Sequence, residues 1–183
     1  MNFTYMIIKP DGIPLINSIC NELNTNGIDV IEKYRVDHFD ELSIPLYLDN
    51  EAINRGNAPI IIGINSIFER HYGTTAIILL LNSRRHESKD EFIVRVCALK
   101  KELRRKYIGG YRAYEGIVSK DDYLKYGLQY SEGLALKRCT FTGDNGEMHY
   151  MFQVNAIHSP DDVIAYNREM KVLQEYGAFR NTI

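Results

Sequence analysis

The run Thr74–Leu81, with the sequence TTAIILLL, constrains this chain more than any other segment. It is short and apolar from Ala76 onward, so it predicts a strand at the centre of a sheet. With 183 residues, 45% of them hydrophobic, the chain can bury a core around that strand without disulfides or a structural metal. Intrinsic disorder, collagen, a coiled coil and a disulfide-stapled miniprotein are therefore excluded.

The other expected elements alternate between strands and helices. Strands are expected at 3–9, 28–39, 134–142 and 147–157, and helices at 15–23, 60–72, 89–107 and 160–176, with a short helix and loop within 40–59. The last two strands flank Gly143–Gly146, GDNG, which is a strong hairpin signal. This mixture, hairpin included, indicates an α+β fold with a largely antiparallel sheet covered by helices, rather than a doubly wound parallel sheet.

Charge and cysteine content limit the function classes. The net charge is −2, which argues against a general nucleic-acid binder but permits a local basic pocket for one small anion. Cys20, Cys97 and Cys139 lie far apart and form no C-x-x-C pair, so neither a zinc ribbon nor a redox dithiol is indicated. The odd number of cysteines and the lack of a signal-peptide pattern at Met1 predict a reducing, cytoplasmic setting. No apolar run is long enough to span a bilayer.

Lys9 is the first candidate for chemistry. It stands at the end of the first expected strand, directly before the turn Pro10–Gly12. A lysine at that position extends its side chain into the space over the ends of the strands, where a ligand could bind. The alternative is a solvated lysine before a tight turn.

His158 is the second candidate, because it lies between a strand and Ser159, which we expect to cap the following helix. An imidazole is partly unprotonated near neutral pH and can act as a nucleophile or a base. Glu169 follows eleven residues later and would fix the tautomer of His158 if the turn between strand and helix folds back. The alternative is a histidine of the capping region packed on its neighbours.

The basic end of the helix over 89–107 is the third candidate. Arg104, Arg105 and Arg112 bracket the break at Gly109-Gly110. Guanidinium groups beside a flexible turn suit a phosphate better than lysines do. The alternative is a solvated run of charges on the helix surface.

Together these segments resemble the nucleoside diphosphate kinases. The resemblance rests on K-P-D-G at 9–12, R-K-x-x-G at 105–109, N-x-I-H-x-x-D at 155–161, and Glu169 eleven residues after the histidine. It covers both ends of the chain well and about 110–145 poorly, so we expect a single domain over 1–183 with an insertion there. The resemblance implies a ferredoxin-like α+β sandwich, to which the hairpin strand at 134–142 is an addition.

The resemblance also implies an activity. The γ-phosphate of a nucleoside triphosphate would move to a nucleoside diphosphate, or a related acceptor, through a phosphohistidine. His158 would be the nucleophile and Glu169 would orient it, while Lys9 and Arg105 would hold phosphate charge and Asn155 would contact the sugar or a phosphate. Mg²⁺ would bridge the nucleotide phosphates, held mainly by the nucleotide rather than by metal ligands of the protein. A homo-oligomer is expected.

The chain departs from the family pattern at phosphate- and base-contacting positions. Leu15 and Asn145 stand where the family has arginines, and Tyr111 stands where it has a threonine. Arg112 or Arg138 could supply the missing charge, and we count Tyr111 and Arg112 among the candidate nucleotide contacts. Two other interpretations stay open: a catalytically weak or inactive nucleotide-binding module, and a structural or partner-binding domain that keeps the scaffold.

Overall fold

The computed structural model describes residues 3–49, 51–52, 57–128 and 148–183. In chain order the elements are β1 (Phe3–Ile8), η1 (Pro10–Leu15), α1 (Ile16–Thr25), β2 (Ile28–Val36), α2 (Phe39–Tyr47), α4 (Ala58–His71), β3 (Ala76–Ser83), α5 (Lys89–Ile108), β4 (Arg112–Val118), α6 (Lys120–Lys125), β5 (Met148–Val154), β6 (Ile157–His158) and α7 (Val163–Tyr176).

The chain divides into two compact units. The first, here called the sheet unit, comprises Met1–Phe39, Thr75–Arg112 and Asn155–Ile183. The second unit comprises Asp40–Thr74 and Ala113–Val154. A single domain over 1–183 stays a prediction.

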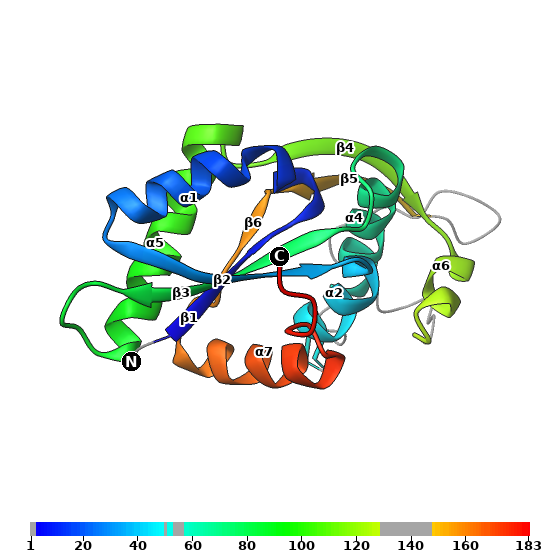
Figure 1. Ribbon diagram of the computed structural model, residues 1–183. Helices are drawn as coiled ribbons and strands as arrows, with labels where there is room; N and C mark the ends of the chain where they lie inside the picture. Colours follow the sequence, from blue (N-terminus) through cyan, green and yellow to red (C-terminus); the bar gives the residue numbers. More distant parts are fainter. Residues whose placement is uncertain (1–2, 50, 53–56, 129–147) are drawn as a thin grey trace. The chain divides into compact units, whose positions relative to one another are not determined.

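The sheet unit is built on a four-stranded sheet in the order β2-β3-β1-β6 (Figure 1). All three strand pairs are antiparallel. The apolar run predicted to be central forms β3, which has β1 on one side and β2 on the other. The predicted α+β fold with an antiparallel sheet is thus confirmed.

Helices cover both faces of this sheet, with α1 and α5 on one side and α7 on the other (Figure 1). Side chains of a strand alternate between faces, and β1 shows what each face does. Met6 and Ile8 are fully buried in the apolar core that α1 and α5 complete. Tyr5 points the other way and meets Tyr166 of α7, with ring centroids 6.1 Å apart. The polar residues of the candidate site lie on this second face, between the sheet and α7.

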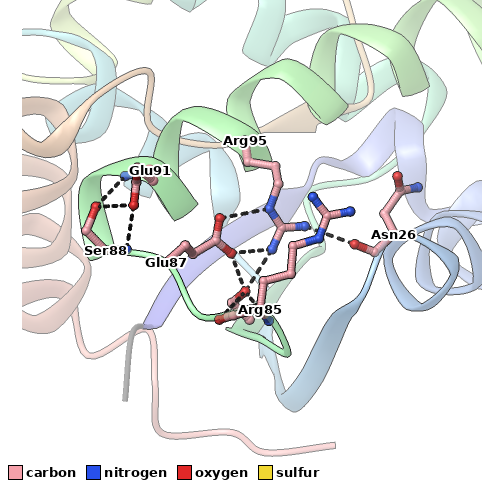
Figure 2. A network of polar contacts seen from close by, with 7 residues as sticks. Asn26, Arg85, Glu87, Ser88, Glu91 and Arg95 are labelled. Carbon is pink, nitrogen blue, oxygen red and sulfur yellow. Dashed lines mark hydrogen bonds and ion pairs between the residues drawn. The ribbon is translucent and has the colours of Figure 1, made fainter.

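Helix α5 begins at the predicted capping box. The Ser88 hydroxyl accepts the Glu91 N–H, and the Glu91 carboxylate accepts the Ser88 N–H at 2.7 Å. One turn later Arg95 donates to Glu87 at 2.5 Å and to the Asn26 carbonyl at 2.9 Å (Figure 2). This network joins the start of α5 to the end of α1 and fixes the helix whose later turns reach the candidate site.

Helix α7 begins later than the sequence predicts. Asp162 is its N-cap and accepts the Ala165 N–H at 2.8 Å. The prediction that Ser159 caps the helix is wrong, because the chain stays extended past β6 and the Ser159 carbonyl is bound by a side chain of α5. The buried Ser159 hydroxyl makes no hydrogen bond within the described part of the chain. Gly177 ends the helix at φ 76°, as predicted.

The second unit contains α4, α6, most of α2 and a two-stranded sheet of β4 and β5. Asn65 of α4 accepts from the Ser43 hydroxyl at 2.8 Å and donates to the Asp40 carbonyl at 2.9 Å, which joins α4 to α2. Phe152 of β5 packs so tightly on Gly63 of α4 that a Cβ atom there would overlap its ring. A glycine is therefore required at that helix position.

Two elements of the second unit were missed by the sequence analysis. The expected strands and helices include none over 108–133, yet β4 and α6 both lie there. In β4, with the sequence RAYEGIV, half-buried and exposed positions alternate up to a buried last residue. A tyrosine and a glycine obscure this strand period in the sequence. The predicted strand 134–142 and its hairpin turn lie outside the described residues. Within the described ranges, no helix has the length and apolarity needed to cross a membrane.

Candidate active site around His158

Strand register places His158 on the polar face of the sheet. Strand β6 is only two residues long, and its His158 pairs with Ile7 of β1. Tyr5 and Lys9 lie two residues to either side of Ile7, so their side chains share its face. The ladder continues past β1, because the Lys9 N–H donates to the Ala156 carbonyl at 2.8 Å. The sequence thus brings Tyr5, Lys9 and His158 together through the pairing of one strand.

Glu169 of α7 reaches His158 from above this face. Its Oε2 lies 2.8 Å from Nε2 of His158 and also accepts the hydroxyl of Tyr5. Its Oε1 lies 3.2 Å from Nη2 of Arg168. Glu169 is 4% exposed, so these bonds replace water around a buried carboxylate. The turn between β6 and α7 does fold back, and it leaves Nδ1 as the ring nitrogen that faces away from Glu169.

The surroundings of His158 favour its neutral form. Burial lowers the pKa of His158, and the charges of Lys100 and Lys9 lower it further. The hydrogen bond and the charge of Glu169 act in the opposite direction without overcoming burial. A neutral imidazole whose Nε2–H is bound by a carboxylate carries its lone pair on Nδ1, which is the nitrogen that can act as a nucleophile.

Lys9 is buried rather than solvated, which excludes the simpler alternative for this residue. Its exposure is 7%, and Nζ donates to Oδ1 of Asn155. Burial lowers the pKa of Lys9 from 10.5 to about 8; Asp11 opposes this shift, and Arg104 and Lys100 add to it. A buried ammonium would stabilise an anionic ligand bound beside it, because the surroundings screen the attraction less than water does.

The turn before His158 is strained and held from both sides. Ala156 has φ 59°, a left-handed conformation that costs a residue with a Cβ roughly 1–2 kcal/mol. Its N–H donates to Oδ2 of Asp11 at 2.7 Å, and its carbonyl accepts the Lys9 N–H. The Ile157 N–H donates to the Asn155 carbonyl at 2.6 Å, which closes a three-residue turn. Asp11 is therefore the side chain that fixes the turn directly before His158.

Two cations of α5 bind the segment that surrounds His158. Nζ of Lys100 donates to the Ser159 carbonyl at 2.7 Å, and Nε of Arg104 donates to the Ile157 carbonyl at 3.1 Å. These residues are one helical turn apart, so they share a face of α5. The i, i+4 spacing is the signal that could have found them in the sequence.

The other candidate nucleotide contacts are placed differently. Arg105 and Tyr111 are exposed, and Tyr111 is 53% exposed. Arg112 is half-buried, and its charge acts on Asp11. Burial raises the pKa of Asp11 overall, while the charge of Lys9 and, more weakly, that of Arg112 oppose this rise. The structure thus gathers Lys9, Asn155, His158 and Glu169 and leaves Arg105 and Tyr111 on the surface; their roles stay predictions. The described residues contain no group of three or more His, Cys, Asp or Glu side chains placed to hold a metal ion.

Comparison with known proteins identifies the fold. No protein-family model and no curated protein matches the sequence. Among solved structures, an NDP kinase from Pyrobaculum aerophilum aligns with a TM-score of 0.50 and 15% identity, over 93% of this chain and 94% of that one. The chain has a nucleoside-diphosphate-kinase-like fold.

Two further structures of this kind align over similar lengths. One is a nucleoside-diphosphate kinase from Borrelia burgdorferi with bound vanadate and ADP, at TM-score 0.49 and 16% identity over 93% of this chain and 84% of that one. The other is a nucleoside diphosphate kinase from Aquifex aeolicus, at TM-score 0.47 and 14% identity over 94% of both chains. The alignment with the Pyrobaculum aerophilum structure confirms, at the level of the fold, the resemblance predicted from the sequence.

Proposed function

We propose that the protein is a phosphotransferase that moves the γ-phosphoryl group of a nucleoside triphosphate to a nucleoside diphosphate, or a related acceptor, through phospho-His158. The observation that carries this proposal is the buried contact of 2.8 Å between His158 Nε2 and Glu169, beside the buried ammonium of Lys9. The nucleoside-diphosphate-kinase-like fold supports it.

In the first half-reaction, Nδ1 of neutral His158 attacks the γ-phosphorus. The N–P bond forms as the bond to the β,γ-bridging oxygen breaks, and its electron pair leaves with the nucleoside diphosphate. In the second half-reaction, a terminal phosphate oxygen of the acceptor attacks the phosphorus, the N–P bond breaks, and its electron pair returns to Nδ1. The histidine is regenerated and no other co-reactant is needed.

Glu169 and Lys9 have separate roles in this scheme. Glu169 accepts the hydrogen bond from Nε2–H throughout, so the ring keeps its tautomer and its orientation while Nδ1 reacts. Lys9 neutralises phosphate charge, which is the main requirement of phosphoryl transfer. Asn155 holds the Lys9 ammonium and is positioned to contact the same ligand. Mg²⁺ belongs to the substrate here, since it would arrive bridging the phosphates of the nucleotide.

Intact-mass analysis after incubation with ATP and Mg²⁺ tests the proposal. The wild type should gain one phosphoryl group that is labile to acid, and His158→Ala should gain none. His86→Ala, which removes an exposed histidine outside the site, should behave as the wild type. A panel of nucleoside diphosphates added to the phosphorylated protein then identifies the acceptor.

A nucleotide-binding module without activity is the second candidate function. It is favoured by the exposure of Arg105 and by Leu15 and Asn145, which stand at arginine positions of the resembling family. This candidate predicts a rise in melting temperature with nucleotide but no phosphoprotein. An unchanged melting temperature together with an unchanged mass would overturn both functions.

A further inference from the structure

Lys100 is a buried cation that the proposed reaction scheme does not use. Its side chain is 4% exposed and lies in the middle of α5. Nζ donates to the Ser159 carbonyl at 2.7 Å and to Oδ1 of Asp161 at 2.7 Å. Burying an ammonium is costly unless it is paired and hydrogen-bonded, and both conditions are met here. An apolar side chain at this position would avoid that cost, so we asked what the charge of Lys100 contributes.

Asp161 is held as the counter-ion of Lys100. Partial burial raises the pKa of Asp161, but hydrogen bonds from Lys100 and Cys97 outweigh it and lower the pKa to about 2. The Cys97 thiol donates to the same oxygen at 3.1 Å. Asp161 itself is 73% exposed. The pair therefore joins a buried positive end to a negative end that reaches solvent, and Asp161 stays ionised across the neutral range.

The pair lies next to the nucleophile in sequence and in space. Lys100 binds the carbonyl of Ser159, the residue directly after His158. The ammonium is therefore bound one residue beyond the imidazole. Other charged or titratable groups surround His158. Tyr5 and Lys9 lie on the β1 side, Glu169 and through it Arg168 on α7, Arg104 on α5 at the Ile157 carbonyl, and Asp161 beyond the turn.

We propose that Lys100 is a positioning residue for His158. It anchors the peptide that follows the imidazole, and with Asp161 it sets the balance of buried charge beside the ring. A fixed positive charge there disfavours protonation of His158 and stabilises a dianionic phosphoryl group on it. The second consequence rests on the proposed function; the first does not.

Two substitutions shift this balance in opposite directions. Lys100→Met keeps an unbranched side chain of nearly the same length and removes the positive charge, so the pKa of His158 should rise. Asp161→Asn removes the negative charge and keeps an oxygen acceptor for Lys100, so the pKa of His158 should fall. Lys101→Met, at the exposed neighbour on the same helix, is the matched control and should leave it unchanged.

The first readout is the pH titration of the His158 ring protons by NMR in the absence of nucleotide, with the resonance assigned through His158→Gln. Shifts of opposite sign in Lys100→Met and Asp161→Asn support the inference. No shift in either variant, or shifts of the same sign, would overturn it. If Lys100→Met fails to fold, Asp161→Asn decides alone, because it alters an exposed side chain.

The second readout is the rate of phospho-His158 formation from ATP. Lys100→Met should slow it by roughly 10- to 100-fold, the effect of a misplaced reacting group, and Lys100→Arg should recover part of the loss. An unchanged rate in Lys100→Met would remove the catalytic consequence. A wild type that never forms phosphohistidine would refute the proposed function while leaving the titration result standing.

Discussion

Gly12 lies directly against the backbone of Ala156. A Cβ atom on Gly12 would be 3.1 Å from the Ala156 carbonyl carbon and 3.2 Å from its Cα, and closer still to the carbonyl oxygen. The turn of η1 and the turn before His158 are therefore fitted to each other through their backbones, where neither can give way as a flexible side chain can.

Gly12→Ala should consequently destabilise the protein by about 2 kcal/mol or more, the range for overpacking at a site that cannot relax. Urea unfolding measures the change in the free energy of unfolding. Gly73→Ala is the control, because a Cβ there meets open space and the loss reflects only its φ of 79°, about 1 kcal/mol. Equal losses in the two variants would contradict the close fit.

Tyr5→Phe should loosen Glu169. The hydroxyl donates to Oε2 of Glu169 inside the fold, and a hydrogen bond to a buried charge contributes about 1.5–3 kcal/mol. We expect a loss of that size in the free energy of unfolding and a slower formation of phospho-His158. Tyr166→Phe removes a hydroxyl from the ring packed beside Tyr5 and serves as the comparison.

Glu169→Gln should separate orientation from binding. The carboxylate raises the pKa of His158 against the effect of burial, so its neutralisation should lower that pKa further. Turnover should fall by roughly 10- to 100-fold because the ring loses its fixed orientation, while nucleotide affinity stays near that of the wild type. Equal falls in turnover and affinity would contradict an orienting role.

Lys9 should make stability depend on pH in the alkaline range. Its pKa is about 8 when folded and 10.5 when unfolded, so the unfolded chain binds more protons between these values and stability rises with pH there. Relative to Lys9→Met, the wild type should gain on the order of 3 kcal/mol in the free energy of unfolding from pH 7.5 to 10.5. A difference between the two proteins that does not change with pH would show that Lys9 is not desolvated.

Arg104 and Arg105 are adjacent, but replacing each by alanine should affect a different property of the protein. Arg104→Ala removes the donor on the Ile157 carbonyl and should cost about 1–2 kcal/mol of stability by urea unfolding. Arg105→Ala, at an exposed position, should leave stability unchanged and weaken nucleotide binding by roughly 1.5–3 kcal/mol if it holds phosphate. Calorimetric titration with nucleotide measures the second effect, and unchanged affinity would remove Arg105 from the site.

The elements that the sequence predicts well are those whose pattern is local. The apolar run of β3, the capping box at Ser88 and the helix stop at Gly177 each contain their own signal within a few residues. The end of α7 was predicted from such a signal and its start was not. Ser159 has the right residue type for a cap, but the side chain that holds its carbonyl comes from Lys100, 59 residues earlier.

The residues of the candidate site likewise fall into those that a local pattern predicts and those that depend on distant contacts. Lys9 and His158 were found because each stands at a strand end, where side-chain chemistry is expected. Tyr5 and Lys100 were missed, and Arg104 was considered only as one of several arginines beside Gly109-Gly110. The i, i+4 spacing places Lys100 and Arg104 on one face of α5, but the carbonyls that they bind lie more than 50 residues away in the sequence. Arg104 and Arg105 look alike in the sequence because both belong to one basic run. They differ in the face of α5 that each occupies.

The short strand β6, which carries His158, is an edge strand of the four-stranded sheet that the described residues form. The Ala156 carbonyl points toward β1, where it accepts the Lys9 N–H, so the next carbonyl, that of Ile157, points toward the open edge. The guanidinium of Arg104 binds that carbonyl. An edge strand with free backbone groups invites pairing with another chain, and Arg104 blocks that pairing beside His158. The same arginine thus protects the protein against strand-to-strand association at the point where such pairing would cover His158.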